Sequence, residues 1–162
     1  MESNEVRIGI ADLNVVSSPG KIITVGLGSC IGIALYDNKI SLGGLAHIML
    51  PDSTQFNSLS KPLKFADLAI PLLLEKMERA GAKKRNIKAK IAGGASMFNF
   101  SDKGMINDIG NRNGLAVKAS LEKLCIPLIS IDIGGNKGRT MILDAESGIV
   151  YIRTVGMGTK EL

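Results

Sequence analysis

The chain has 162 residues, of which 45% are hydrophobic and 22% are charged, and its formal net charge is +5. That length is enough for one domain with its own core, and that composition excludes a disordered chain. The absence of tryptophan and an aromatic content of 4% argue against a single-strand nucleic-acid binder, which needs stacking surfaces. The basic run Lys83-Lys84-Arg85 is typical of a solvated face, so we expect no nucleic-acid partner.

Signals for export or membrane insertion are missing from the sequence. The N-terminal letters MESNEVRIG lack the basic and apolar regions of a secretory signal, and no apolar run approaches the roughly 20 residues that a spanning helix requires. The two cysteines, Cys30 and Cys125, are too few for a disulfide framework and are expected to be reduced thiols. We therefore expect a cytoplasmic protein with no direct membrane insertion.

The first part of the chain has mainly β-patterns. In VRIGIADLNVV, Val6, Ile8 and Ile10 alternate with other residues, which predicts one strand with a single buried face. Three more strands are predicted from KIITVGL, CIGIALYD and SLGGLAHIML, which are residues 21–27, 30–37 and 41–50. Asp37-Asn38 suits a tight turn between the last two. Because these runs are short and adjacent, we expect neighbouring antiparallel strands.

A helical pattern follows over residues 63–80. Four apolar residues at intervals of four, three and four form one stripe, namely Ala66, Ile70, Leu73 and Met77. Gly81 is a natural end for this helix. Pro71 lies inside it and must either kink or divide it, because proline lacks a backbone donor.

The rest of the chain predicts more strands and one more helix. IKAKIAGG is a strand, a helix is expected from about Asn111 to Leu124 with an asparagine as its cap, and IPLISIDIGG is another strand. RTMILDAESGIVYIRTV predicts two strands joined at residues 146–148. Two helices among about seven strands indicate an α+β fold, with packed, mostly antiparallel β-sheets and flanking helices. With no repeat and no linker, residues 1–162 are expected to form a single domain.

The glycine-rich stretch TVGLGSCIG, residues 24–32, allows three interpretations. A phosphate-binding loop is the weakest, since Gly26, Gly28 and Gly32 give G-x-G-x-x-x-G, one residue longer than the dinucleotide motif, and a strand rather than a helix follows. A close-packed sheet corner with Cys30 as a small buried apolar residue is the second, because free cysteine is often buried. The third is a nucleophile beside backbone amides.

The third interpretation depends on His47, the single histidine of the chain. If the strands on either side of Asp37-Asn38 pair as a hairpin, Cys30 and His47 come to the same end of the sheet. A neighbouring histidine stabilises a thiolate and can deliver protons. The backbone N–H groups of Gly28, Ser29 and Cys30 could then bind an oxyanion.

A third group should orient the imidazole, and the hydroxyl of Thr24 is available for this. Cys125, between the end of a helix and the start of a strand, is interpreted as core or helix-end packing. On spacing alone, the catalytic and the structural interpretations of Cys30 and His47 both stay open.

Five motifs, in order, resemble those of the CheD family of bacterial chemoreceptor glutamine deamidases: TVGLGSCIGIALYD, GGLAHIMLP, AGGASMF, IGNRN and IDIGGNKGR. The resemblance extends from about residue 5 to residue 155. It implies that Cys30 is the nucleophile, His47 its base and acid partner, and Thr24 the residue that positions the histidine. It also implies a fold related to deamidating bacterial toxins, acyl transfer through a thioester, and no metal or cofactor.

The same resemblance implies partners. Methyl-accepting chemoreceptors are the expected substrates, with methyl-ester hydrolysis as a related chemistry, and the phosphatase CheC is an expected partner of a chain that is otherwise monomeric. Phe98 and Phe100 are candidates for an apolar contact in an interface or for core packing. Two alternatives remain open: a stoichiometric CheC- and receptor-binding regulatory module with little catalysis, and a thiol-dependent hydrolase of small amides.

Overall fold

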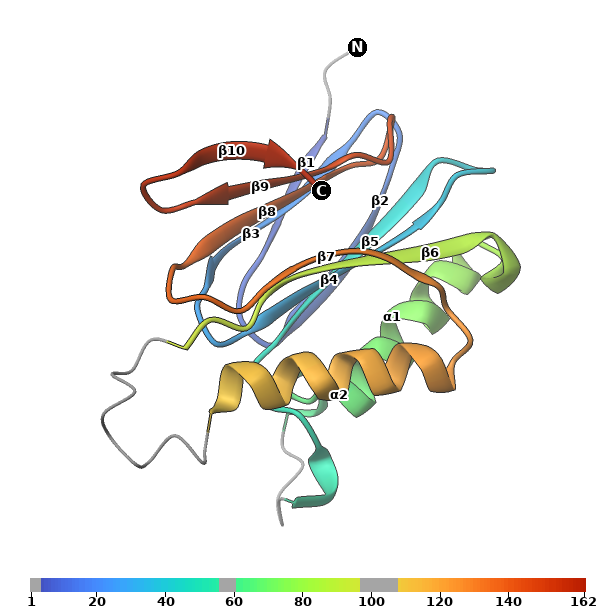
Figure 1. Cartoon of the computed structure of the whole chain (residues 1–162). Coiled ribbons are helices and arrows are strands. Elements are labelled where there is room, and N and C mark those ends of the chain that lie inside the picture. The colour runs from blue at the N-terminus through green and yellow to red at the C-terminus, as the bar shows by residue number, and fades with distance from the viewer. Residues whose placement is uncertain (1–3, 56–60, 97–107) are drawn as a thin grey trace.

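The computed structural model describes residues 4–55, 61–96 and 108–162, and these contain ten strands and two α-helices (Figure 1). The strands are β1 (Glu5–Ile8), β2 (Asp12–Ser17), β3 (Lys21–Leu27), β4 (Ile31–Asp37), β5 (Leu42–Ile48), β6 (Ile87–Gly93), β7 (Leu128–Ile133), β8 (Arg139–Asp144), β9 (Val150–Thr154) and β10 (Gly158–Glu161). The helices are α1 (Ala66–Arg79) and α2 (Ile109–Lys123), with short 3₁₀ turns at Ser53–Gln55, Pro62–Lys64 and Lys84–Asn86.

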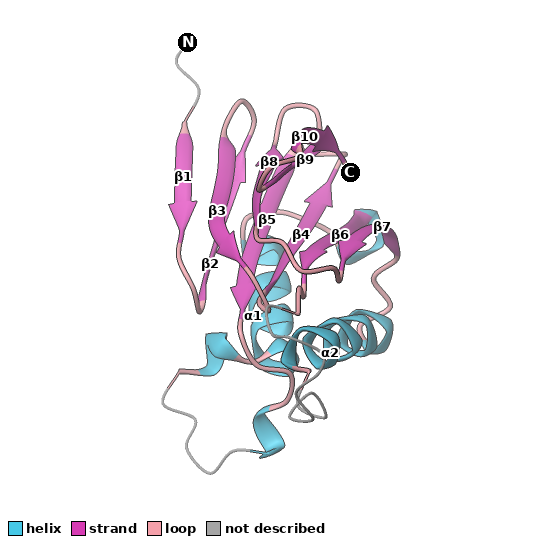
Figure 2. Cartoon of the chain, turned by 60° about the vertical axis from the view of Figure 1, so that its left-hand side comes forward, coloured by secondary structure: helices cyan, strands magenta, loops and turns pink. Residues whose placement is uncertain are grey.

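The strands form two sheets of five. We call β1-β3-β8-β9-β10 the outer sheet and β2-β5-β4-β6-β7 the central sheet. Only β1 with β3 and β6 with β7 pair in parallel among the strand pairs of the described residues. Both helices cover the face of the central sheet that is turned away from the outer sheet, which gives three layers (Figures 1 and 2). The predicted α+β class with mostly antiparallel packed sheets is therefore confirmed.

The middle strands of the central sheet, β4 and β5, are buried on both faces along almost their whole length, and their sequences reflect this. Ile31, Ile33 and Leu35 of β4 face the helices, while Ala34 faces the outer sheet. All seven residues of β5 are buried. Such strands are near-continuous apolar runs rather than alternating ones.

The predicted antiparallel hairpin forms. β4 pairs antiparallel with β5 so that Ile31 lies opposite Ile48, Gly32 opposite His47 and Asp37 opposite Leu42.

Helix α1 confirms the predicted apolar stripe, whose four members are fully buried. It is one continuous helix that includes Pro71, so the chain is not divided there, and packing of the stripe offsets the missing hydrogen bond. The left-handed Gly81 (φ +107°) follows its end, as predicted.

Helix α2 begins at Ile109, two residues before the predicted start. Its cap is Asp108 rather than an asparagine, and the carboxylate accepts the Asn111 N–H at 3.2 Å. Aspartate and asparagine serve this position equally well, so the sequence does not separate them. Cys125 lies just after this helix and is exposed, which confirms the helix-end interpretation but not core packing.

The prediction of one strand over residues 6–16 is wrong. Residues 9–11 turn the chain, so that β1 joins the outer sheet and β2 joins the central sheet. Ala11 has a φ of 59° and Ile10 is 56% exposed. Alternation continued across the turn by coincidence. The strands β3 and β4, which were expected to be neighbours, also belong to different sheets, because the chain passes from the outer to the central sheet at residues 28–30.

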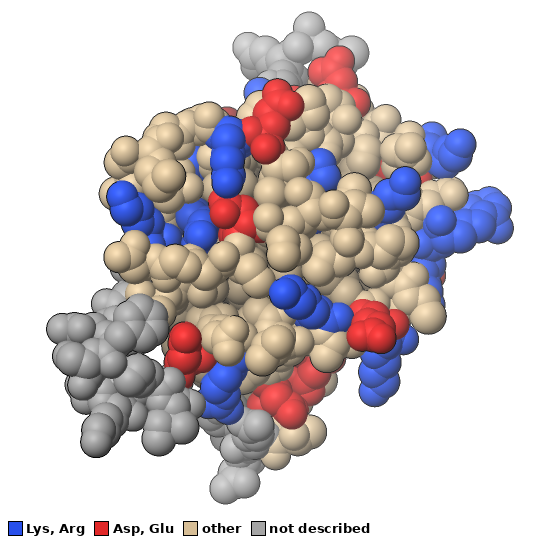
Figure 3. All heavy atoms as spheres, in the orientation of Figure 1, with Lys and Arg blue, Asp and Glu red and all other residues tan. Residues whose placement is uncertain are grey.

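Charged side chains are mixed over most of the face in Figure 3, with basic ones gathered over the turn between α1 and β6. Lys83, Lys84 and Arg85 in that turn are exposed, in agreement with a solvated face. In the described part of the chain, no helix is both long and apolar enough to span a bilayer.

Candidate active site

His47 lies near the end of β5 and faces the layer between the two sheets, with no exposed surface. Its cross-strand neighbour on β4 is Gly32. A Cβ at Gly32 would lie 2.7 Å from the sulfur of Met141 and 3.1 Å from Leu27, so a larger residue would have to displace these side chains. The two sheets therefore approach each other closely beside His47.

Thr24 holds one side of this imidazole. It lies on β3 of the outer sheet, and its Oγ1 is 2.7 Å from Nδ1 of His47 and 3.0 Å from the carbonyl oxygen of Ile8. A hydroxyl has one proton, which Thr24 donates to the Ile8 carbonyl. Nδ1 of His47 must then carry a proton and donate it to Thr24. The other nitrogen, Nε2, is left with its lone pair available.

Nε2 of His47 is buried and has no hydrogen-bond partner among the described residues. A buried polar atom without a partner is uncommon and frequently marks a functional position. Burial also lowers the pKa of His47 to about 4, because desolvation penalises the imidazolium form. At neutral pH the residue is therefore a neutral imidazole whose free nitrogen can accept a proton.

Cys30 immediately precedes β4 and is half-buried. It packs against the layer between the sheets, the layer that His47 also faces. Ile31 pairs with Ile48 and Gly32 with His47, so Cys30, one residue before Ile31, lies at the same end of the hairpin as His47. The structure thus brings Cys30, His47 and Thr24 to one end of the sheets, as the hairpin prediction required.

Burial raises the pKa of the Cys30 thiol, while its own backbone N–H acts in the opposite direction. With the thiol pKa raised and that of His47 lowered, the resting pair is a neutral thiol and a neutral imidazole. The thiolate would form as the proton moves to Nε2 when substrate arrives.

The backbone around Cys30 is anchored through its carbonyl groups. Those of Gly28, Ser29 and Cys30 accept from Ala95 N–H (2.8 Å), Asn113 Nδ2 (3.0 Å) and Gly94 N–H (2.8 Å), respectively. The N–H of Gly28 donates to Gly26. The N–H groups of Ser29 and Cys30 donate to no backbone carbonyl of the described residues. Of the predicted oxyanion donors, Ser29 and Cys30 are therefore available, whereas Gly28 is engaged.

Sequence reasoning missed two buried side chains that support this turn. Asn113 of α2 reaches it directly, as described above. Arg139 of β8 donates to the carbonyls of Gly93 (3.1 Å) and Gly134 (2.8 Å), and its Nε lies 3.5 Å from Asp132. The motifs IGNRN and IDIGGNKGR contain both residues, but only the fold shows which carbonyl groups they hold.

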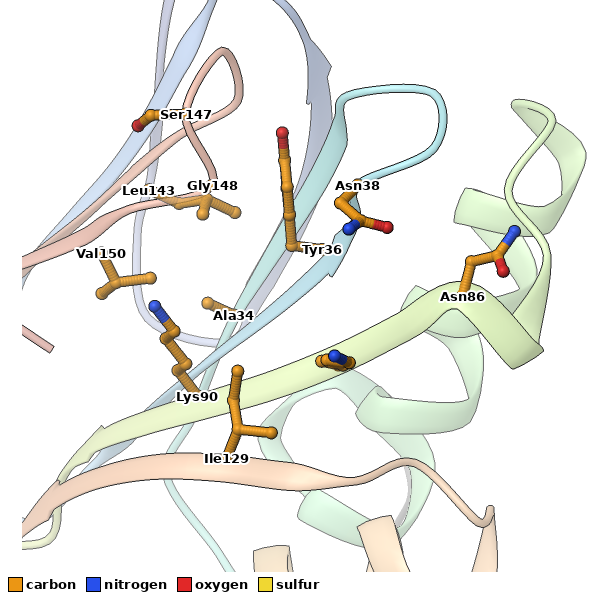
Figure 4. Close-up of a pocket in the computed structure, with 11 residues that line it drawn as sticks. Ala34, Tyr36, Asn38, Asn86, Lys90, Ile129, Leu143, Ser147, Gly148 and Val150 are labelled. Atoms are coloured by element: carbon orange, nitrogen blue, oxygen red, sulfur yellow. The ribbon is translucent and has the colours of Figure 1, made fainter.

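Two cavities bear on the location of a site. One of about 430 Å³ adjoins the Cys30 turn and is lined by Gly94, the start of α2 and residues 133–136. The other, of about 240 Å³, opens between the sheets at their opposite end, where Tyr36 and Lys90 face Leu143 (Figure 4). Neither cavity is lined by Thr24, Cys30 or His47. No group of three or more His, Cys, Asp or Glu that could hold a metal occurs in the described ranges.

Comparison with known proteins shows to which family the chain belongs. Residues 49–154 match the family model described as CheD chemotactic sensory transduction. The chain belongs to the CheD family. A protein of Clostridium botulinum (strain Hall) named "Probable chemoreceptor glutamine deamidase CheD" is 68% identical over all 162 residues, and a Clostridium kluyveri protein with the same name is 65% identical; each match covers the whole of both chains.

A solved structure supports the fold. The Bacillus licheniformis hypothetical protein YfiH is similar with a TM-score of 0.50 over 77% of this CheD-family chain and 51% of that protein. At 16% identity this likeness concerns the fold alone. The matched family model begins at residue 49, after Thr24, Cys30 and His47, whereas the full-length relatives include that region.

Proposed function

We propose that this chain is a chemoreceptor glutamine deamidase that hydrolyses a glutamine side-chain amide through a thioester on Cys30. The observation that carries the proposal is the hydrogen bond from His47 Nδ1 to Thr24, which leaves Nε2 as a free base on the side of the sheet where Cys30 lies. The names of the CheD relatives supply the substrate, a glutamine of a chemoreceptor.

The first half-reaction forms the acyl-enzyme. Nε2 of His47 takes the thiol proton as Sγ of Cys30 attacks the carboxamide carbon of the substrate. The carbonyl oxygen becomes an oxyanion and is bound by the N–H groups of Ser29 and Cys30, which have no backbone acceptor in the resting state. The imidazolium then protonates the departing amine, the C–N bond breaks, and ammonia leaves behind a thioester.

The second half-reaction hydrolyses this thioester. His47 is neutral again and accepts a proton from water, whose oxygen attacks the same carbonyl carbon. The C–S bond breaks, the thiol regains its proton from His47, and glutamate is released. Thr24 keeps Nδ1 protonated throughout, so Nε2 alone exchanges protons. A receptor methyl ester would pass through the same thioester.

The test is to incubate the purified protein with a chemoreceptor cytoplasmic fragment and to follow glutamine conversion to glutamate by mass spectrometry. We expect site-specific conversion by the wild type and none by Cys30→Ala or His47→Ala. Cys125→Ser is the matched control, since it removes an exposed thiol far along the sequence from the site and should leave the rate unchanged. Conversion by Cys30→Ala at the normal rate would reject the thioester mechanism.

The CheC partner and a cytoplasmic location are proposed from the family resemblance alone. Phe98 and Phe100, the residues predicted for an interface, lie outside the described residues. Two measurements on Cys30→Ala separate a deamidase from a binding module: a pull-down of receptor and CheC, and chemotactic adaptation in cells. A binding module keeps its partners and its effect on adaptation without the thiol, whereas an enzyme loses the effect on adaptation.

A further inference from the structure

Asn113 is the one side chain among the described residues that hydrogen-bonds the backbone on both sides of the candidate pair. It is fully buried in α2, and its Nδ2 lies 3.0 Å from the carbonyl oxygen of Ser29 and 3.0 Å from that of Met49. Ser29 immediately precedes Cys30, and Met49 follows His47 by two residues. Two carbonyl oxygens facing one atom require a donor there, so the amide orientation is fixed by chemistry.

The contact with Ser29 has a consequence for Cys30. In a planar trans peptide, the carbonyl of one residue and the N–H of the next point in opposite directions. The Ser29 carbonyl faces Asn113, and the N–H of Cys30 must therefore point away from Asn113. That N–H donates to no described backbone carbonyl. It is therefore left to bind the oxygen of a tetrahedral intermediate on Sγ.

The neighbouring peptide is fixed in a different way. The Gly28 carbonyl accepts from the backbone N–H of Ala95, which directs the N–H of Ser29. Only a proline at position 95 would remove that donor, and it would also restrain the backbone there. The Ser29–Cys30 peptide, in contrast, depends on a side chain. A hydrogen bond to a carbonyl also polarises its amide and strengthens the N–H as a donor.

We propose that Asn113 is a positioning residue that orients the Ser29–Cys30 peptide and so aims the N–H of Cys30 at the oxyanion. This inference rests on the proposed acyl-transfer function. It assigns to α2 a part in transition-state stabilisation, although Asn113 itself touches neither substrate nor Sγ in the proposed mechanism.

The test compares two reactions of the same thiol. Acylation of Cys30 by p-nitrophenyl acetate passes through an oxyanion, forms an S–C bond and releases p-nitrophenolate. Alkylation of Cys30 by iodoacetamide displaces iodide at a saturated carbon and forms no oxyanion. In Asn113→Ala we expect acylation, and kcat for receptor deamidation, to fall roughly 10- to 100-fold. KM and the alkylation rate of Cys30, located by peptide mass spectrometry, should stay at wild-type values.

Two further variants complete the design. Asn113→Ser fits the same space, and its hydroxyl can donate to one of the two carbonyls, so its acylation rate should lie between those of Asn113→Ala and wild type. If Asn113→Ala does not fold, the acylation rate of Asn113→Ser tests whether Asn113 positions the peptide. Val117→Ala is the matched control, because Val117 is a fully buried residue one turn further along α2. Val117→Ala should lower the thermal midpoint and leave the rates of acylation and alkylation of Cys30 unchanged.

The inference is overturned if the Asn113 variants acylate at the wild-type rate. It is overturned equally if acylation and alkylation fall by the same factor, because Asn113 would then be holding the whole turn in place. A wild-type protein that is acylated by the ester but converts no receptor glutamine rejects the proposed function, and the acylation rates of the variants still decide the role of Asn113.

Discussion

Thr24 determines which nitrogen of the candidate histidine carries the proton. Its hydroxyl donates to Ile8 and can only accept from His47. Thr24→Val keeps the shape and removes the acceptor, so Nδ1 and Nε2 would compete for the proton. We expect kcat for deamidation to fall by roughly two orders of magnitude or more, as when other catalytic histidines lose the group that orients them.

The control for this change is Thr140→Val. Thr140 lies on β8 next to Met141, which faces the layer between the sheets, and so it occupies the opposite face of the outer sheet. Steady-state kinetics on both variants test the prediction. Equal rates for Thr24→Val and wild type would show that packing alone orients the imidazole.

His47 should make stability depend on pH. Its pKa is about 4 in the folded protein against an ordinary value of 6.5, because burial disfavours the charged form. The unfolded chain therefore binds a proton near pH 6.5 and the folded protein only near pH 4. The contribution of His47 to the free energy of unfolding is therefore fully present above pH 6.5. It is lost as the pH falls towards 4, and the loss is at most ~3 kcal/mol.

Denaturant unfolding at pH 7, 5.5 and 4.5 measures this effect. Other titrating groups contribute equally to wild type and to His47→Gln, so the difference between the two isolates the histidine. We expect the free energy of unfolding to fall more steeply with decreasing pH in wild type. Parallel pH profiles would mean that the imidazole is solvated in the folded state.

The three candidate catalytic residues could be found from sequence because each carries a distinctive side chain. Cys30 and His47 stand on either side of a recognisable hairpin turn, and the strands on either side of it pair antiparallel as predicted. Asn113 could not be found in this way. A polar residue within an amphipathic helix is ordinarily assigned to the solvent side, and its two carbonyl acceptors are 84 and 64 residues away in sequence.

At the scale of elements, α2 docks on the Cys30 turn through a glycine. A Cβ at Gly110 would lie 2.6 Å from the carbonyl oxygens of both Gly94 and Ala95, the residues whose N–H groups hold the turn. Gly110→Ala should therefore displace the helix, lower stability by about 1–3 kcal/mol and reduce deamidation.

Gly114→Ala provides the comparison one turn further along α2. Its Cβ would meet only Ile133 at 3.4 Å, an ordinary contact, and alanine favours helix by up to about 1 kcal/mol. This variant should be as stable as wild type or more so. Thermal denaturation of Gly110→Ala and Gly114→Ala tests the prediction, and an equal fall in the midpoint of both variants would contradict it.

The elements show where pattern-based prediction is limited. Hydrophobic patterns identified β3 to β9 and both helices, because each of these elements buries either one face or, as in β4 and β5, nearly all of its residues. It did not reveal that β1 and β2 belong to different sheets, since the residues that turn the chain between them, including exposed Ile10, continue the alternation. The short strand β10 has four exposed residues and so carries no periodic signal.

For the whole molecule, the decisive feature is that the site spans two layers. Thr24 belongs to the outer sheet and His47 to the central sheet, and the hydrogen bond between them crosses from one sheet to the other. Cys30 lies on the connection that leads into the central sheet. A slight separation of the sheets breaks this bond before secondary structure is lost. We expect activity to disappear at a lower urea concentration than the far-UV circular dichroism signal. Coincident midpoints would show that the layers separate only on global unfolding.

The pairing of β3 with β8 has a consequence for biosynthesis. Thr24, Cys30 and His47 all lie within the first 50 residues, yet the strand of Thr24 is held by residues 139–144 and the Cys30 turn by residues 94, 95 and 113. A nascent chain that has emerged only as far as its thiol and histidine therefore lacks the contacts that build the proposed site. On the proposed mechanism, catalysis requires the last third of the polypeptide to have left the ribosome, and unfinished chains would not modify receptors.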